Sequence, residues 1–280
     1  MQPGAGLSLG PGASGPSGDA SAPGSDCSDA SKLVYVIADE TNEMYSFAPD
    51  KLLFTKLGVP NCQTNASVNS MAVDRSGNAW INYDDGSIWK VDTTTLNCTA
   101  TSFMSGQDGF SPNLSMGFSS DAAGSSQETL FVSDNTGDDT TNANGKGAAR
   151  VDLTTFALSP LGGPYTGSVA GWRCELTGTG DARLFGFFTT TPAYLAEIQK
   201  ADGTTPQATA LPGVDATMGG YAFSFWGGKF WFYTASTSRT SDVTMFDPTT
   251  SQTQVMLKNI GFTIVGAGVS TCAPLTYTAH

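Results

Sequence analysis

Hydrophobic and polar positions alternate in short segments along this chain, and clusters of turn residues separate them. The stretch from 70 to 95, "SMAVDRSGNAWINYDDGSIWKVDTTT", contains three apolar or aromatic runs, separated by a Gly turn and an Asp-Gly turn and closed by a Thr-rich turn. Runs of this length, rich in aromatic and β-branched residues and bounded by such turns, are typical of β-strands. The pattern predicts three consecutive antiparallel strands in this stretch.

The Thr-rich turn recurs along the chain. "VDTTT" at 91 to 95 is followed by "VDLTT" at 151 to 155 and "FDPTT" at 246 to 250, and looser copies begin at Ile198 and Phe47. The residues that precede the turns, Phe47, Val91, Val151, Ile198 and Phe246, are separated by 44, 60, 47 and 48 residues. A period in the forties indicates the blades of a β-propeller.

The strands upstream of each turn repeat as well. Aromatic runs begin at 33, 79, 129, 183 and 229, and runs of small and apolar residues precede four of them, at 70, 115, 171 and 220. The missing small-residue run is at the other end of the chain, "IVGAGVSTC" at 264 to 272. We therefore predict an all-β, five-bladed propeller whose ring closes when this C-terminal strand pairs with the first strand, near residues 33 to 38.

The same repeat predicts the core. Large apolar side chains within the predicted strands should pack between neighbouring blades. These candidates are Met71, Val73, Trp80, Ile88, Trp89, Val91, Phe118, Phe131, Val132, Phe185, Phe187, Phe223, Phe225, Phe230 and Phe232.

Residues 70 to 92 resemble the repeats of streptogramin-lyase-like and NHL-type propellers, whose units also place an apolar-Asp turn before a Gly and an aromatic strand. The whole chain, from "LVYVIADETNEMYSF" to "GAGVSTCAP", is similar to uncharacterised bacterial envelope proteins of the predicted-lipoprotein kind. This resemblance implies the propeller fold and a location outside the cytoplasm. Streptogramin-type lyases use a catalytic His in the central funnel, whereas the single His of this chain is His280, its last residue.

Composition separates the chain into regions. Residues 1 to 26 contain seven Gly, five Ser, four Pro and four Ala, and they cannot bury enough side chain to offset the entropy of ordering. We expect 1–26 to be a disordered tether or an inert low-complexity tail, 27–275 a single propeller domain, and 276–280 a tail. A tether of this kind commonly links a secreted or lipid-anchored domain to a membrane, so we expect its targeting segment to have been removed. No apolar run approaches the length of a transmembrane helix.

The net charge of −12 argues against nucleic-acid partners, because phosphate binding requires a basic surface. The five cysteines include no CxxC pair and have no His nearby, which argues against a zinc site. We expect disulfides between Cys27 and Cys272 and between Cys62 and Cys98, with Cys174 as a buried free thiol. Disulfides place the protein in an extracellular space, the periplasm or the cell envelope.

The sequence contains few residues that could form a catalytic site. Without an internal His, acid and base catalysis would depend on carboxylates, and Asp74 and Glu175 occupy comparable positions on predicted inner strands. They could act as a pair in a polysaccharide hydrolase. Asp74 also begins the turn "DRSGN", where its carboxylate would bind its own backbone, and Glu175 could pair with a nearby Arg. The structural interpretation is the stronger one.

Two further sites can be suggested. The loop at 133 to 147 contains Asp134, Asp138 and Asp139, oxygen ligands for a calcium ion, but it does not match the EF-hand pattern and reads better as a solvated hairpin loop. The predicted loops at one mouth of the channel contain Trp172, Arg173, Tyr221 and Trp226, whose aromatic faces and polar groups could bind a glycan or a peptide. We therefore expect a monomeric, non-enzymatic binding or scaffold module for a glycan, peptide or protein ligand, without a cofactor, and the hydrolase as its alternative.

Overall fold

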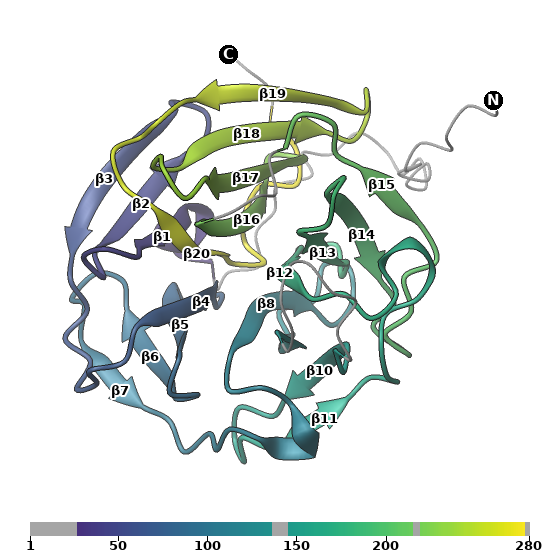
Figure 1. The fold of residues 1–280 in the computed structure, drawn as a ribbon. Coiled ribbons are helices and arrows are strands. Elements are labelled where there is room, and N and C mark those ends of the chain that lie inside the picture. Colours follow the sequence, from purple (N-terminus) through teal and green to yellow (C-terminus); the bar gives the residue numbers. More distant parts are fainter. Residues whose placement is uncertain (1–26, 136–144, 215–218, 278–280) are drawn as a thin grey trace.

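A computed structural model describes residues 27–277 apart from 136–144 and 215–218. Five four-stranded antiparallel sheets are arranged in a ring around a central axis, as predicted (Figure 1). In chain order, blade 1 contains β1 (Val34–Ala38), β2 (Met44–Ala48), β3 (Leu53–Gly58) and β20 (Ile264–Val269). Blade 2 contains β4 (Val68–Val73), β5 (Asn78–Tyr83), β6 (Ile88–Asp92) and β7 (Cys98–Ala100).

Blade 3 contains β8 (Leu114–Ser120), β9 (Glu128–Asp134), β10 (Ala148–Val151) and β11 (Leu158–Pro160). Blade 4 contains β12 (Cys174–Gly178), β13 (Leu184–Phe188), β14 (Tyr194–Ile198) and β15 (Ala208–Ala210). Blade 5 contains β16 (Gly220–Trp226), β17 (Lys229–Ala235), β18 (Asp242–Asp247) and β19 (Gln252–Leu257). Three short 3-10 helices, Ala30–Lys32, Gln107–Gly109 and Gly167–Val169, lie in the connections.

The ring closes in blade 1 by pairing the two ends of the chain. Strand β20 lies inside β1, so the sheet order is β20-β1-β2-β3. In this antiparallel pair Val34 lies opposite Val269 and Ile37 lies opposite Gly266, followed by a bulge at Ala38. The predicted pairing of the C-terminal strand with residues 33 to 38 is therefore confirmed.

The core consists of five hydrophobic clusters, one at each interface between neighbouring blades. Thirteen of the fifteen predicted core residues are buried, and Trp89 and Phe225 are partly buried. The alternation of side chains along each strand produces this arrangement, because successive residues face opposite neighbouring blades.

The repeated turn has the same local structure in three blades. The carboxylates of Asp92, Asp152 and Asp247 each accept a hydrogen bond from the backbone N–H two residues later. In each turn, the fifth residue after the one that precedes the turn has a positive φ. Across the five blades this residue is Leu52, Leu96, Phe156, Gly203 and Ser251. The sequence repeat is thus a repeat of turn geometry as well as of strands.

The structure contains both expected disulfides, Cys27–Cys272 and Cys62–Cys98. The first joins the residue where the described chain begins to Cys272, three residues after the end of the closing strand. The buried Cys174 is a free thiol, and burial raises its pKa to about 12. It therefore behaves as a small buried side chain at neutral pH.

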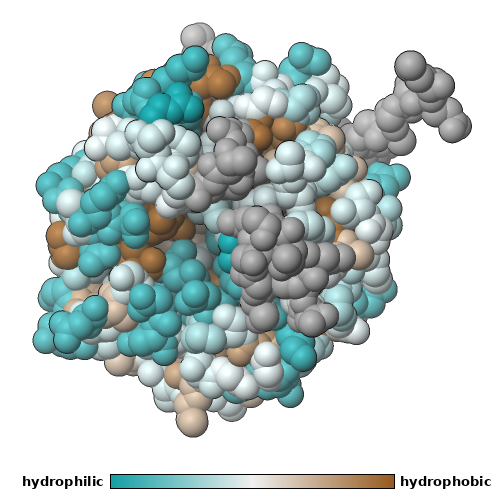
Figure 2. Space-filling model, viewed as in Figure 1, coloured by the Kyte–Doolittle hydropathy of each residue, from teal (hydrophilic) through white to brown (hydrophobic). Residues whose placement is uncertain are grey.

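The face seen in Figure 2 is mostly hydrophilic, with hydrophobic side chains in small separate groups. Among the described residues, no helix has the length and hydrophobicity needed to cross a membrane. The predicted tether, residues 1–26, and His280 at the end of the predicted tail lie outside the described residues.

Candidate functional site

The inner strands of the five blades surround the axis (Figure 1). A pocket opens at one end of the channel between them. It has a volume of about 240 Å³ and a mainly polar lining. Four of the five inner strands, or the residues just before them, contribute its walls: Asn69, Arg173, Glu175, Gly219, Gly220, Tyr221 and Val265. On the fifth inner strand, β8, the Ser115 hydroxyl donates a hydrogen bond to Glu175.

Glu175 forms the polar centre of this pocket. One carboxylate oxygen accepts a hydrogen bond from the Ser70 hydroxyl on β4 at 2.9 Å, and the other accepts one from the Ser115 hydroxyl on β8 at 2.8 Å. The residue is only 4% exposed, and this burial raises the pKa of its carboxyl from 4.5 to about 7, although the two serines and Arg173 oppose the shift. A substantial fraction of Glu175 is therefore protonated at neutral pH, so that it can donate as well as accept.

Arg173 and Tyr221 lie together on the wall of the pocket. The Arg173 guanidinium is 5.8 Å from the centre of the Tyr221 ring. Opposite them, the Asn69 side-chain amide donates to Asn82 and to the Leu114 carbonyl, which fixes its orientation. The pocket thus combines an aromatic face with an amide, a guanidinium and a carboxyl group.

The four predicted mouth residues do not form one group. Arg173 and Tyr221 line the pocket, and Trp172 is partly buried against the hydrophobic cluster between blades 3 and 4. Trp226 is at the opposite end of β16 from Tyr221, is 8% exposed, and donates its indole N–H to the Lys32 carbonyl at 2.9 Å. The expectation that Trp226 lies at the same mouth is wrong, because a seven-residue strand spans the depth of the channel.

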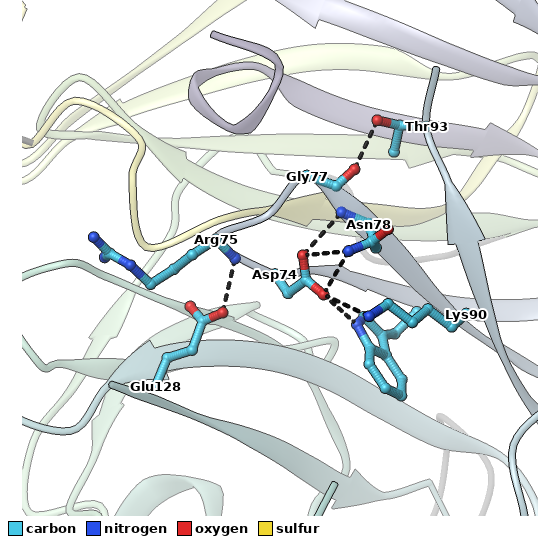
Figure 3. A network of polar contacts seen from close by, with 8 residues as sticks. Asp74, Arg75, Gly77, Asn78, Lys90, Thr93 and Glu128 are labelled. Atoms are coloured by element: carbon cyan, nitrogen blue, oxygen red, sulfur yellow. Dashed lines mark hydrogen bonds and ion pairs between the residues drawn. The ribbon is translucent and has the colours of Figure 1, made fainter. Parts of the chain in front are cut away.

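Asp74 and Glu175 have different partners and lie at different heights along the channel. Asp74 follows the end of β4, where its carboxylate accepts hydrogen bonds from Asn78 and from the Trp80 indole (Figure 3). Glu175 instead contacts Ser70, and at a strand rise of about 3.3 Å per residue the backbone positions of Ser70 and Asp74 differ by roughly 13 Å. Paired glycosidase carboxyls are roughly 5–9.5 Å apart, so the geometry does not favour the hydrolase.

Glu128, which belongs to no sequence motif, lies near Asp74 in Figure 3 but has different partners. It begins β9 and accepts hydrogen bonds from the Arg75 backbone N–H and the Thr271 hydroxyl, both at 2.7 Å. Burial raises its pKa from 4.5 to about 7. Glu128 thereby links blade 3 to the turn after β4 and to the chain after β20. In the sequence it looks like an ordinary strand-flanking residue, since all its partners are distant.

The end of the channel opposite the Glu175 pocket is tightly packed. A Cβ atom added at Gly178 would lie 2.1 Å from the Phe118 carbonyl oxygen, and one added at Gly180 would lie 2.4 Å from the Thr271 carbonyl oxygen. The Arg75 guanidinium also contacts the Thr271 hydroxyl and the Cys27 sulfur. Neighbouring chain segments are therefore in close contact at this end of the channel.

Of the three residues considered as alternative calcium ligands, Asp138 and Asp139 lie outside the described residues. Asp134 is 1% exposed, and its carboxylate oxygens accept hydrogen bonds from the backbone N–H groups of Ser111 and Lys146, both at 2.8 Å. Within the described part of the chain, no group of three or more His, Cys, Asp or Glu side chains could hold a metal ion. Asp134 has a structural role in fixing the two loops at this end of blade 3.

Comparisons with known proteins support the fold. No protein-family model matches the sequence, and no curated protein matches it. Among solved structures, a protein of unknown function from Bacteroides thetaiotaomicron has a TM-score of 0.50 and 11% identity, covering 83% of this chain and 57% of that chain. TolB from Acinetobacter baumannii has a TM-score of 0.46 and 13% identity, covering 81% of this chain and 52% of that one.

A catalytically inactive virginiamycin B lyase from Staphylococcus aureus, solved with quinupristin, has a TM-score of 0.42 and 13% identity over 84% of this chain and 72% of that chain. The chain spans little more than half the length of the first two proteins. At these identities the similarity concerns the fold alone.

Proposed function

We propose that this protein is a non-enzymatic binding module that recognises a glycan through the pocket around Glu175. The observation that carries this proposal is the convergence of Asn69, Arg173, Glu175 and Tyr221 on one pocket at the end of the channel. A sugar presents apolar ring faces and hydroxyl edges, which match an aromatic ring flanked by hydrogen-bonding groups. The module is secreted or held at the cell surface, where its two disulfides are stable.

The chemistry of the pocket supports binding rather than catalysis. In the described part of the chain, Glu175 is the one carboxyl group that lines it, and Asp74 is engaged with Asn78 and Trp80. Hydrolysis of a glycosidic bond needs a second carboxyl group near the first. A partly protonated Glu175 is instead suited to exchange hydrogen bonds with hydroxyl groups.

The test is binding to a glycan array, followed by titration calorimetry with the best glycan. We expect Arg173→Ala and Tyr221→Ala each to weaken binding at least tenfold. Two matched controls lie away from the pocket: Arg150→Ala, an exposed arginine on β10, and Tyr277→Ala, an exposed tyrosine near Trp226. Unchanged binding by both pocket variants would refute the site, and binding confined to a parallel peptide array would replace the glycan with a peptide ligand.

A further inference from the structure

A second pocket lies between blades 4 and 5. A comparison of the repeated turn in blades 3 and 5 explains why it is present. In blade 3 the turn after β10 places Leu153 and Phe156 against the hydrophobic cluster between blades 2 and 3. At the two equivalent positions blade 5 has Pro248 and Ser251. The shorter side chains fill less of the interface between blades 4 and 5.

The resulting cavity has a volume of about 70 Å³, whereas one water molecule needs roughly 10–15 Å³ on the same scale. Its lining is largely apolar, and the aromatic residues come from both blades. Phe185 of β13 and Phe230 of β17 meet edge to face at 4.8 Å, and Phe225 and Leu275 form further walls. Leu275 belongs to the segment after the Cys27–Cys272 disulfide, which packs against the turn at Gly228.

The rim of this pocket is acidic. Asp181 is exposed, and its carboxylate accepts a hydrogen bond from Thr179. Arg183 crosses the Phe185 ring at 4.7 Å, but Glu197 neutralises it through two hydrogen bonds of 3.0 and 2.7 Å. The neighbouring Lys229 and Asp247 form an ion pair with each other. Asp181 places a negative charge beside the opening, with Lys200 as an electrostatic neighbour, on a chain whose net charge is −12.

We propose that this pocket is a docking site for a partner protein, which inserts an aromatic or branched apolar side chain next to a basic residue. The apolar side chain takes the space that Leu153 and Phe156 occupy in the equivalent interface, and the basic residue pairs with Asp181. The pocket is bounded by Thr179 and Arg183, on the turn between β12 and β13, at the end of the channel opposite Tyr221. Partner docking is thus spatially independent of the Glu175 pocket.

The experiment uses the full chain, ¹⁵N-labelled, and a nine-residue Gly-Ser peptide with Phe-Lys at its centre. We expect saturable shifts of the Gly228 and Leu275 amides, with the Tyr221 amide unaffected. Peptides with Ala-Lys or Phe-Glu at the centre should bind at least tenfold more weakly. Equal binding of the Phe-Glu peptide, or shifts centred on Tyr221, would overturn the proposal.

Substitutions in this chain test separately the insertion of the apolar side chain and the pairing of the basic residue with Asp181. Pro248→Leu restores the residue type found at Leu153, in a turn with the same Asp-to-backbone hydrogen bond, and should reduce binding at least tenfold without lowering the melting temperature. Should that variant fold poorly, Leu275→Trp obstructs the pocket from the half-buried opposite wall. Asp181→Asn should weaken binding about fivefold, and Asp50→Asn, also exposed, serves as its charge control.

Wild-type affinity in both obstructing variants would exclude the pocket as the docking site. A peptide that binds only after removal of residues 1–26 would indicate that the chain's own N-terminal segment is the occupant, which would also overturn the proposal.

Discussion

Val34 of β1 lies directly opposite Val269 of β20, so the first and last strands of the described chain are neighbours in one sheet. The pairing supplies the inner strand of blade 1 from the far end of the chain and removes the exposed edges of an open stack of blades. Side chains of the two strands also pack together, since Val34 and Val269 belong to the same hydrophobic cluster between blades 5 and 1.

Removal of the closing strand should therefore abolish the fold. A chain that ends at Phe262 loses β20, which leaves β1 unpaired on its inner side and exposes the clusters on both flanks of blade 1. We expect loss of cooperative thermal unfolding, measured by circular dichroism. A chain lacking residues 1–26 is the control and should keep the wild-type melting temperature, since the composition of these residues predicts that they bury little side chain. Cooperative unfolding of the chain that ends at Phe262 would contradict the closure argument.

The two disulfides should contribute unequally to stability. Cys27–Cys272 spans a sequence separation of 245 residues and Cys62–Cys98 one of 36. The loop-entropy estimate gives about 5.5 kcal/mol for the first and about 4 kcal/mol for the second. Urea unfolding of two double Cys→Ser variants, one lacking Cys27 and Cys272 and the other lacking Cys62 and Cys98, measures the contribution of each disulfide to the unfolding free energy. The order would be contradicted by a larger loss of unfolding free energy in the variant lacking Cys62 and Cys98.

The stability should fall between pH 5 and pH 8. Burial raises the carboxyl pKa values of Glu128 and Glu175 from 4.5 to about 7, so the folded state holds these protons more tightly than the unfolded state. Each contribution is fully present below pH 4.5, declines as the pH rises to 7, and is lost above it; its full size is roughly 3 kcal/mol. Urea unfolding at pH 5 and pH 8 measures the difference.

Two variants assign this pH dependence. Glu175→Gln keeps hydrogen-bonding groups for Ser70 and Ser115 but cannot titrate, so it should reduce the difference in unfolding free energy between pH 5 and pH 8 by about half. Asp50→Asn, at an exposed acidic residue, should leave the difference unchanged. An undiminished difference in Glu175→Gln would show that the titrating groups lie elsewhere.

Asp74 should matter for stability and not for chemistry. Its carboxylate accepts the Asn78 backbone N–H at 2.9 Å and the Trp80 indole N–H at 3.0 Å in a nearly buried position. Because Asp74→Ala leaves these donors unpaired, we expect a loss of about 2–4 kcal/mol in unfolding free energy. Asp84→Ala removes a single exposed hydrogen bond to Ser67 and should cost less than about 1 kcal/mol. Equal losses in the two variants would contradict the role assigned to Asp74.

The sequence by itself determined the repeat and therefore the architecture. Three copies of the recurring turn share an Asp, all five have a residue with positive φ at the same spacing, and the strands require period-two alternation. These are local properties that neighbouring residues dictate. The closing strand was also predictable, because one small-residue run lacked an aromatic strand after it, and the two cysteines that flank the closed ring indicated their pairing.

Only the tertiary structure decided which side chains meet at the axis. Tyr221 and Trp226 are close in sequence but lie at opposite ends of one strand, whereas Glu175 meets Ser70 and Ser115 from two other blades. The role of Glu128 follows only from the hydrogen bonds that it accepts from Arg75 and Thr271. Contacts of this kind depend on the order, tilt and closure of five separate sheets, which no local pattern encodes. The repeat fixed the positions of the strands, and the closed ring determined the polar environment of the channel.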